Sequence, residues 1–355
     1  MYEKFKIPSK VNALNLIRKK LSFINIPKYI FFTKKDFEKN KKYYLKKIIF
    51  NFKTNIIVRS SSLSEDTYKS SNAGKFDSII IKKGNFNTLE KSIFKIIKKF
   101  KNKDDQILVQ SFIGEPDVSG VVFTKDINTN SDYYQIEYDI SKRSDLVTSG
   151  KKNPSLKTLI VFKKSKKIPA HFKKLINICR YLENLFNNNR LDIEFCIKKN
   201  RVYIFQCRPL LGVTKKSDIE KHEKVLVNLK KKFDKINLKI PNISGKNTVL
   251  SNMADWNPAE MIGCKPGKLS ISLYSELITN SIWSLQRLNY GYKDVMPNRL
   301  MIDMAGAPYI DLRTDLNSFL PKKLSSNTSS KLVENAINTL KKYPAFHDKI
   351  EFKII

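Results

Sequence analysis

Four polar residues near position 200 are of the types that bind a metal ion and phosphate. They are Asp192, Glu194, Gln206 and Arg208. Residues 191–209 predict a β-hairpin that turns at Lys199 and Asn200. If Glu194 pairs with Gln206, strand alternation places all four side chains on one face. That face would offer oxygens to Mg²⁺ and a guanidinium to phosphate. A polar, solvent-facing side of a half-buried hairpin is the alternative, and the residues alone do not separate the two.

Arg59 is a second candidate, because it follows the apolar run of residues 56–58 at the end of a predicted strand. A serine-rich turn comes next, and then a bend at Ala73 and Gly74 that lets backbone approach a ligand. Arginine suits bidentate phosphate binding, and hydroxyl and backbone N–H groups can add contacts. An ordinary loop with a surface arginine is the alternative.

Several familiar classes of protein are excluded. The sequence has no GxxxxGK[ST] and no GxGxxG, and no two of its 11 glycines are adjacent, which excludes P-loop and Rossmann sites. No apolar run reaches the length of a membrane span, and we expect no membrane partner. The four cysteines form no CxxC pair, so we expect a cytoplasmic protein.

The net charge of +34 suggests nucleic acid, but its distribution does not. Residues 1–55 carry 15 lysines and arginines against 3 acidic residues, whereas residues 246–321 carry 7 of each. The excess is lysine scattered over every predicted helix face rather than arginine interleaved with aromatics. We therefore predict no specific nucleic-acid partner; a nucleic-acid-binding protein remains an alternative.

Hydrophobic periodicity predicts a mixed α and β organisation. Strands are predicted at 55–59, 76–82, 106–112, 119–125, 132–138, 157–163, 191–197 and 201–207. Helices are predicted around 93–100, 172–186, 220–236 and 270–288, with a strand and turn at 300–312. Ser217 and Glu220 predict a capping box. We expect a domain at 1–212, a helical connector at 213–245 and a second domain at 246–355.

Three of these segments occur in the order found in one enzyme family. They are the Val-Arg-Ser-Ser run at 58–61 with its Ala-Gly bend, the Ser-Gly-Val-Val-Phe-Thr-Lys-Asp run at 119–126, and the hairpin motif of Asp192 to Pro209. Over roughly residues 8–212 the chain resembles the N-terminal nucleotide-binding domain of the phosphoenolpyruvate synthase and pyruvate phosphate dikinase family. The resemblance implies an α+β, ATP-grasp-like fold that holds ATP in a cleft.

The same resemblance implies roles for individual residues. Lys10 and Arg59 would bind phosphate, and Glu194 and Gln206 would hold Mg²⁺. Arg208 would contact the transferred phosphates, so that Arg59 and Arg208 are the expected catalytic pair. Gln110 lies where the adenine-side strand of the family passes.

The block from 254 to 313 is similar to the middle domain of a branch found with surface-polysaccharide synthesis. The nearest characterised type is the L-glutamine kinase of capsule phosphoramidate synthesis. We expect a mainly helical, partial acceptor domain here, with L-glutamine or a pyruvate-like molecule as the acceptor. Arg313 beside Asp311 could hold a zwitterionic amino acid. A buried Arg–Asp pair, with Trp256 in a core, is the alternative.

The family passes the phosphoryl group from ATP through a histidine that follows a glycine-rich turn. His171, His222 and His347 are the histidines of this sequence, and none follows such a turn. We therefore expect a phosphohistidine carrier domain elsewhere, in a longer polypeptide or in a separate chain. The predicted function is the ATP-binding part of an AMP-forming phosphotransferase. Direct phosphoryl transfer or ligation within this chain, and a non-catalytic ATP-binding or docking remnant, are the alternatives.

Overall fold

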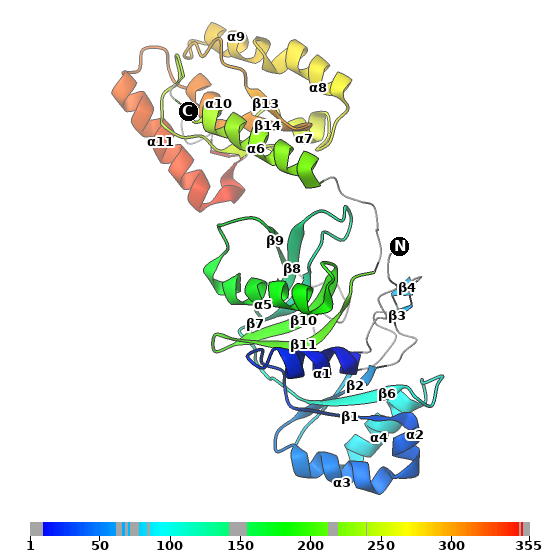
Figure 1. Ribbon diagram of the computed structural model, residues 1–355. Coiled ribbons are helices and arrows are strands. Elements are labelled where there is room, and N and C mark those ends of the chain that lie inside the picture. The colour runs from blue at the N-terminus through cyan, green and yellow to red at the C-terminus, as the bar shows by residue number, and fades with distance from the viewer. Residues whose placement is uncertain are drawn as a thin grey trace. The chain divides into compact units, whose positions relative to one another are not determined.

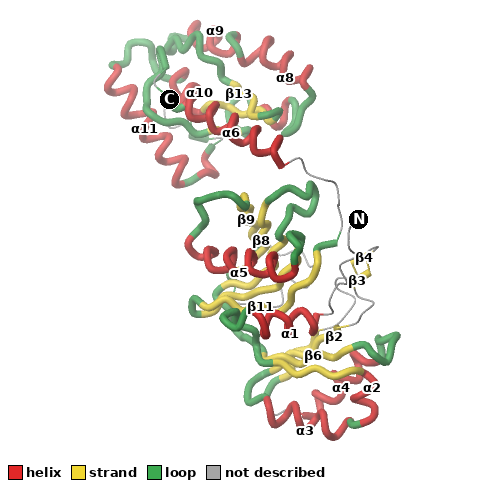
Figure 2. Tube along the Cα trace, viewed as in Figure 1, coloured by secondary structure: helices red, strands yellow, loops and turns green. Residues whose placement is uncertain are grey.

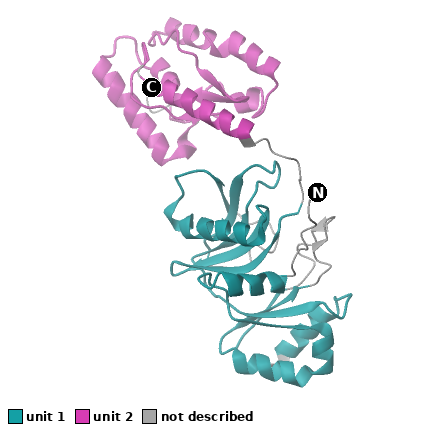
Figure 3. Cartoon of the chain, viewed as in Figure 1, with its two compact units in different colours: residues 1–217 teal, residues 218–355 magenta. Residues whose placement is uncertain are grey.

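The computed structural model describes residues 10–61, 66–67, 70–71, 78–83, 86–141, 155–211, 219–238, 240–347 and 349–350. The chain divides into two compact units, residues 1–217 and 218–355, which we call the N-terminal and C-terminal units (Figure 3). The N-terminal unit combines helices with antiparallel sheets, and the C-terminal unit combines helices with one small antiparallel sheet (Figure 2). The predicted α+β fold class is confirmed.

One half of the N-terminal unit is a four-stranded sheet with the order β1-β6-β2-β5. Its strands are β1 (Tyr29–Thr33), β2 (Ile56–Ser61), β5 (Ser78–Ile81) and β6 (Gln106–Ser111). The helices α2 (Lys34–Lys39), α3 (Lys41–Asn51) and α4 (Phe86–Ile97) share a core with one face of this sheet, which includes Val58 and Val109. Because side chains alternate along a strand, Arg59 and Gln110 lie on the opposite face.

The other half is a five-stranded sheet with the order β11-β10-β7-β8-β9. Its strands are β7 (Val118–Phe123), β8 (Tyr133–Asp139), β9 (Lys157–Phe162), β10 (Leu191–Lys198) and β11 (Arg201–Pro209). The amphipathic helix α5 (Ala170–Phe186) packs Leu175, Ile176 and Cys179 into a core with Ile193 and Ile204. A pair of two-residue strands, β3 (Asp66–Thr67) and β4 (Ser70–Ser71), completes the unit's described strands.

Helix α1 (Lys10–Lys20) connects the two sheets (Figure 1). Val11 and Leu14 pack with side chains of β1 and β6, whereas Ala13 and Ile17 join the core of the five-stranded sheet. The helix therefore packs against both sheets. Its first residue, Lys10, lies beside the space between them.

The C-terminal unit is mainly helical, with its helices arranged around a small sheet of order β12-β14-β13 (Figure 1). The strands are β12 (Leu250–Ser251), β13 (Met301–Met304) and β14 (Ala307–Asp311). The helices are α6 (Ile219–Ile236), α7 (Pro258–Met261), α8 (Lys268–Tyr274), a π-helical turn (Ser275–Thr279), α9 (Ile282–Asn289), α10 (Leu312–Ser318), α11 (Ser326–Lys342) and a 3₁₀ turn (Pro344–Phe346). Trp283, Leu316 and Val333 lie in its core.

All eight predicted strands overlap observed strands, with ends displaced by up to two residues. Strand β1 was not predicted, although its aromatic and β-branched run is the signal that identified the others. The predicted helix at 270–288 is interrupted by the π-helical turn. Helix α6 lies in the predicted connector and belongs to the C-terminal unit. The capping box at Ser217 lies outside the described residues. No helix in the described part of the chain has the length and apolar content needed to cross a bilayer.

Candidate functional site

The hairpin β10–β11 turns where the sequence predicts. Lys198 pairs with Arg201, and the two residues between them, Lys199 and Asn200, have φ angles of 49° and 60°. Positive φ at both central residues is the signature of a type I′ turn, whose twist matches that of the flanking strands. The predicted turn is confirmed.

A β-bulge sets which residues share a face of this hairpin. Regular pairing from a two-residue turn would place Glu194 opposite Phe205 and would turn Gln206 to the other face. The register instead shifts between Glu194 and Phe195, so Phe205 is the extra residue and Glu194 pairs with Gln206. Asp192 then pairs with Arg208. The predicted pairing is confirmed, but through a bulge that was not predicted.

Two ion pairs lie on this face. Arg59 Nη2 donates to Glu194 Oε2 over 2.6 Å and joins the two sheets, and both side chains retain 15% exposure. Arg208 Nε donates to Asp192 Oδ2 over 2.8 Å across the hairpin. Beyond the bond between them, Arg59 retains guanidinium N–H groups and Glu194 retains carboxylate lone pairs that a ligand could use.

Three cations act on the Glu194 carboxylate. Burial alone would raise the pKa of Glu194, but the charges of Arg59, Lys10 and Arg208, together with the hydrogen bond from Arg59, hold the pKa below its ordinary value. Lys10 is thus close enough to act on Glu194 from the start of α1. The structure brings Lys10, Arg59, Glu194 and Arg208 together, with Gln206 opposite Glu194.

An apolar pocket adjoins this charged group within the N-terminal unit. It encloses about 490 Å³, part of it open to solvent. Its lining residues come from both sheets and the chain after β6: Ile57, Arg59, Gln110, Ser111, Phe112, Ile113, Ser119, Gly120, Glu194, Phe195 and Phe205. Phe112, Phe195 and Phe205 supply aromatic surface, which suits a flat, largely apolar ligand.

Gln110 is fully buried beside this pocket and is only half satisfied. Its Nε2 donates to the Phe205 carbonyl over 3.5 Å, at the bulge. Its Oε1 has no hydrogen-bond partner among the described residues. A buried acceptor without a partner costs stability, and an N–H group of a ligand would remove that cost.

Gly120 is the glycine of the 119–126 segment, and its lack of a side chain is structural. A Cβ at this position would lie 2.3 Å from the Glu137 carbonyl oxygen and 3.0 Å from the Phe195 ring. Only glycine lets β7 approach β8 and the pocket wall this closely.

The residues of the charged group could hold Mg²⁺ together with a bound polyphosphate. Among the described residues no group of three or more His, Cys, Asp or Glu side chains could hold a metal ion by itself. Mg²⁺, however, is usually held by one or two carboxylates together with substrate phosphates and water. The Glu194 carboxylate and the opposing Gln206 amide therefore suit a metal that arrives with a polyphosphate.

Arg313 and Asp311 lie in the core of the C-terminal unit. The buried Asp311 side chain caps α10 by accepting from the backbone N–H of Arg313 and Thr314. The fully buried Arg313 guanidinium donates to main-chain carbonyls, those of Ile236, Leu238, Gly245 and Lys246. These contacts favour the structural alternative, because the side-chain groups proposed to bind an amino acid already bond to the backbone of this unit.

The structure describes only part of the predicted Arg59 site, and it adds one residue that the sequence did not indicate. The serine-rich turn beyond Ser61 and the Ala73-Gly74 bend lie outside the described residues. The sequence did not single out Phe205, which the bulge turns toward the pocket. The sequence did contain a signal for the bulge. Regular pairing around a two-residue turn joins only positions separated by an odd number, whereas Glu194 and Gln206 are separated by an even number.

Comparison with known proteins gives a local match. The chain is 29% identical over 103 residues to pyruvate, phosphate dikinase 2 of Zea mays, covering 29% of this chain and 11% of that protein. A chloroplastic pyruvate, phosphate dikinase of Mesembryanthemum crystallinum matches at 29% identity over 104 residues, 29% of this chain and 10% of that protein. The chain thus spans about a tenth of the length of these relatives. No family model matches.

Solved structures with some likeness include amino-acid ligases. The VanG D-Ala:D-Ser ligase of Enterococcus faecalis has a TM-score of 0.35 at 13% identity, covering 57% of this chain and 52% of that one. The D-alanine–D-alanine ligase of Bacillus anthracis complexed with ATP has a TM-score of 0.34 at 14% identity, covering 62% and 60%.

Proposed function

We propose that the N-terminal unit is an ATP-grasp-like domain that binds Mg·ATP for phosphoryl transfer of the phosphoenolpyruvate synthase and pyruvate phosphate dikinase type. One observation carries the proposal: Lys10, Arg59 and Arg208 act together on Glu194 beside an aromatic-lined pocket. The local similarity to pyruvate, phosphate dikinases supports it.

The pocket suits the adenine ring. Phe112, Phe195 and Phe205 offer surface to a flat base. Gln110 Oε1, which is buried and lacks a partner among the described residues, would accept a hydrogen bond from an N–H of the base. This contact would give Gln110 the adenine-side role that the family resemblance implies.

The charged group suits the phosphates. Glu194 and Gln206 would hold Mg²⁺, which supplies charge neutralisation to the phosphate oxygens. Arg59, Lys10 and Arg208 would bind those oxygens directly. The Arg59–Glu194 ion pair would then be replaced by two complementary contacts, phosphate beside the guanidinium and Mg²⁺ beside the carboxylate. Catalysis by such a site consists mainly of positioning and electrostatic stabilisation.

The acceptor step requires a group that this chain's motifs do not supply. We propose that a phosphohistidine carrier domain, in cis or in trans, receives the phosphoryl group and passes it to a small acceptor such as L-glutamine or pyruvate. The four cysteines are free thiols, which supports a cytoplasmic location.

Calorimetry and product analysis test this function on the whole chain. We expect saturable Mg·ATP binding, and no phosphorylated acceptor when the chain is incubated with Mg·ATP and L-glutamine or pyruvate. Sustained AMP formation with stoichiometric phosphorylated acceptor would instead establish direct transfer within this chain. Absence of nucleotide binding, with salt-sensitive binding of generic DNA, would overturn the proposal.

A further inference from the structure

Arg190 is a cation on the site face that the sequence motif does not include. It lies directly before β10, and its carbonyl accepts a hydrogen bond from the Leu210 N–H over 2.8 Å. The hairpin ladder therefore continues past the first residue of β10. Strand alternation then places Arg190 on the face of Asp192 and Glu194, opposite the face that carries Leu191 into the core.

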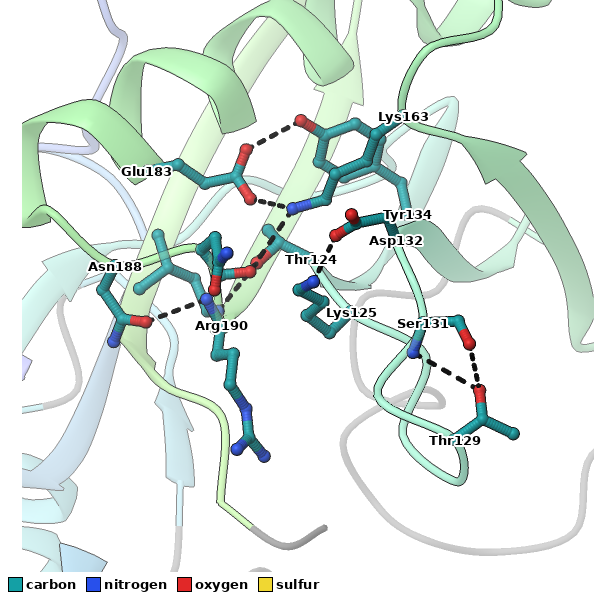
Figure 4. Close-up of polar contacts among 12 residues, drawn as sticks. Thr124, Lys125, Thr129, Ser131, Asp132, Tyr134, Lys163, Glu183, Asn188 and Arg190 are labelled. Carbon is teal, nitrogen blue, oxygen red and sulfur yellow. Dashed lines mark hydrogen bonds and ion pairs between the residues drawn. The ribbon is translucent and has the colours of Figure 1, made fainter. Parts of the chain in front are cut away.

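The direction of the side chain agrees with this placement. Figure 4 shows the Arg190 side chain extending away from α5, and away from the Glu183 and Lys163 side chains. Lys163, Tyr134 and Glu183 form a separate polar group beneath α5, in which Glu183 accepts from both partners. Arg190 takes no part in that group.

Among the residues that the structure describes, Arg190 differs from its cationic neighbours in having no acidic partner. Four nearby cations form ion pairs: Lys125 with Asp132, Lys163 with Glu183, Arg208 with Asp192, and Arg59 with Glu194. Within the described part of the chain Arg190 forms no ion pair, and its buried Nε has no hydrogen-bond partner. Burial lowers the pKa of this guanidinium, with no carboxylate to offset it.

We propose that Arg190 binds the terminal phosphate of Mg·ATP, an inference that rests on the proposed function. Along β10 the face runs from Glu194 at the pocket, through Asp192, to Arg190, over about 13 Å between the first and last Cα atoms. With the base in the pocket and the metal at Glu194, the polyphosphate extends toward Arg190.

The chemistry of the guanidinium fits this position. Its planar N–H groups can donate in parallel to two oxygens of one phosphate, which an ammonium group cannot do. A partly buried cation without a counter-charge attracts an anion more strongly than a solvated one does. Arg208 lies diagonally across the hairpin from Arg190, so the two guanidiniums can contact neighbouring phosphates.

Calorimetric titration of Arg190→Gln with Mg·ATP and with AMP tests the inference. We expect Mg·ATP affinity to fall at least about tenfold and AMP affinity to stay within about twofold of wild type. Arg190→Lys is expected to recover only part of the loss. Arg201→Gln is the matched control, because Arg201 is an exposed arginine at the turn end of the same hairpin. It should bind both nucleotides normally.

The outcomes separate this inference from the proposed function. If Glu194→Ala weakens Mg·ATP binding but Arg190→Gln does not, the role of Arg190 is wrong and the ATP site stands. Equal losses for Mg·ATP and AMP in Arg190→Gln would show a structural role and overturn the inference. A wild-type chain that binds no Mg·ATP overturns the proposed function, and the inference with it.

Discussion

The two units use arginine in opposite ways. In the N-terminal unit Arg59 and Arg208 each pair with one carboxylate and remain partly exposed beside the pocket. In the C-terminal unit Arg313 is fully buried, and Arg287 pairs with Asp255 and Asp315 and lies 3.8 Å from the centre of the Phe319 ring. An Arg–Asp pair in sequence therefore does not identify a site. Partial exposure beside a pocket distinguishes the proposed site from the buried pairs.

The largest expected effect follows from removing a core arginine. Arg313→Ala would leave several main-chain carbonyls without their donor and open a cavity, so we expect a loss of at least about 3 kcal/mol in unfolding free energy. Arg299→Ala, at an exposed position of the same unit, is the control and should change stability little. Thermal melting with and without L-glutamine measures both. Normal stability combined with a lost glutamine response would restore a substrate role for Arg313.

Next in size are substitutions at the charged group of the N-terminal unit. Glu194→Ala removes a charged oxygen and Gln206→Ala a neutral one, so Glu194→Ala should weaken Mg·ATP binding more, with each loss about 1–3 kcal/mol. The double variant should lose less than the sum, because either change disrupts the shared site.

Calorimetry should also compare Arg208→Ala between ATP and AMP, and two turn variants with wild type. Arg208→Ala should weaken ATP more than AMP, because its proposed contacts are to the outer phosphates. Lys198→Ala and Lys199→Ala at the turn should bind Mg·ATP normally. Losses at the turn as large as that of Glu194→Ala would mean that binding is a diffuse effect of the basic surface.

Gly120→Ala tests the close approach of strands beside the pocket. The added Cβ would collide with the backbone carbonyl of Glu137, so we expect the variant to be about 1–3 kcal/mol less stable. Gly114→Ala is the matched control, because its Cβ would meet only the Phe112 ring, with two ring atoms at 3.4 and 3.8 Å. Chemical denaturation compares the two, and equal stability would show that β7 and β8 can separate without cost.

The smallest expected effect is a pH dependence. The pKa of Glu194 is held below its ordinary value, so its ionised form contributes stability above that value. The contribution is lost as the pH falls through the lowered native pKa. Wild type should therefore lose its advantage over Glu194→Gln as the pH falls below about 4.5, the ordinary value, and through the lowered native pKa. A stability difference that does not change over this range would contradict the electrostatic account.

Local patterns predicted the elements of the N-terminal unit well, because alternation and helical periodicity report which side chains are buried. They also placed Arg59, Glu194, Gln206 and Arg208 correctly in their strands. Patterns did not predict the Arg59–Glu194 contact, which joins residues 135 positions apart through the packing of two sheets. Patterns also did not predict the contacts of Arg313, since its carbonyl partners come from α6 and the loop that follows it.

The bulge at Phe205 has a consequence for chain length. Deleting Phe205 would leave Glu194 opposite Gln206, because the bulge holds a residue that the pairing does not need. It would remove one aromatic wall of the pocket and the carbonyl that receives Gln110 Nε2. Hairpins one residue shorter can thus keep Glu194 opposite Gln206 while reshaping the pocket. Divergent sequences with this hairpin are best aligned by the two polar pairs rather than by a fixed separation.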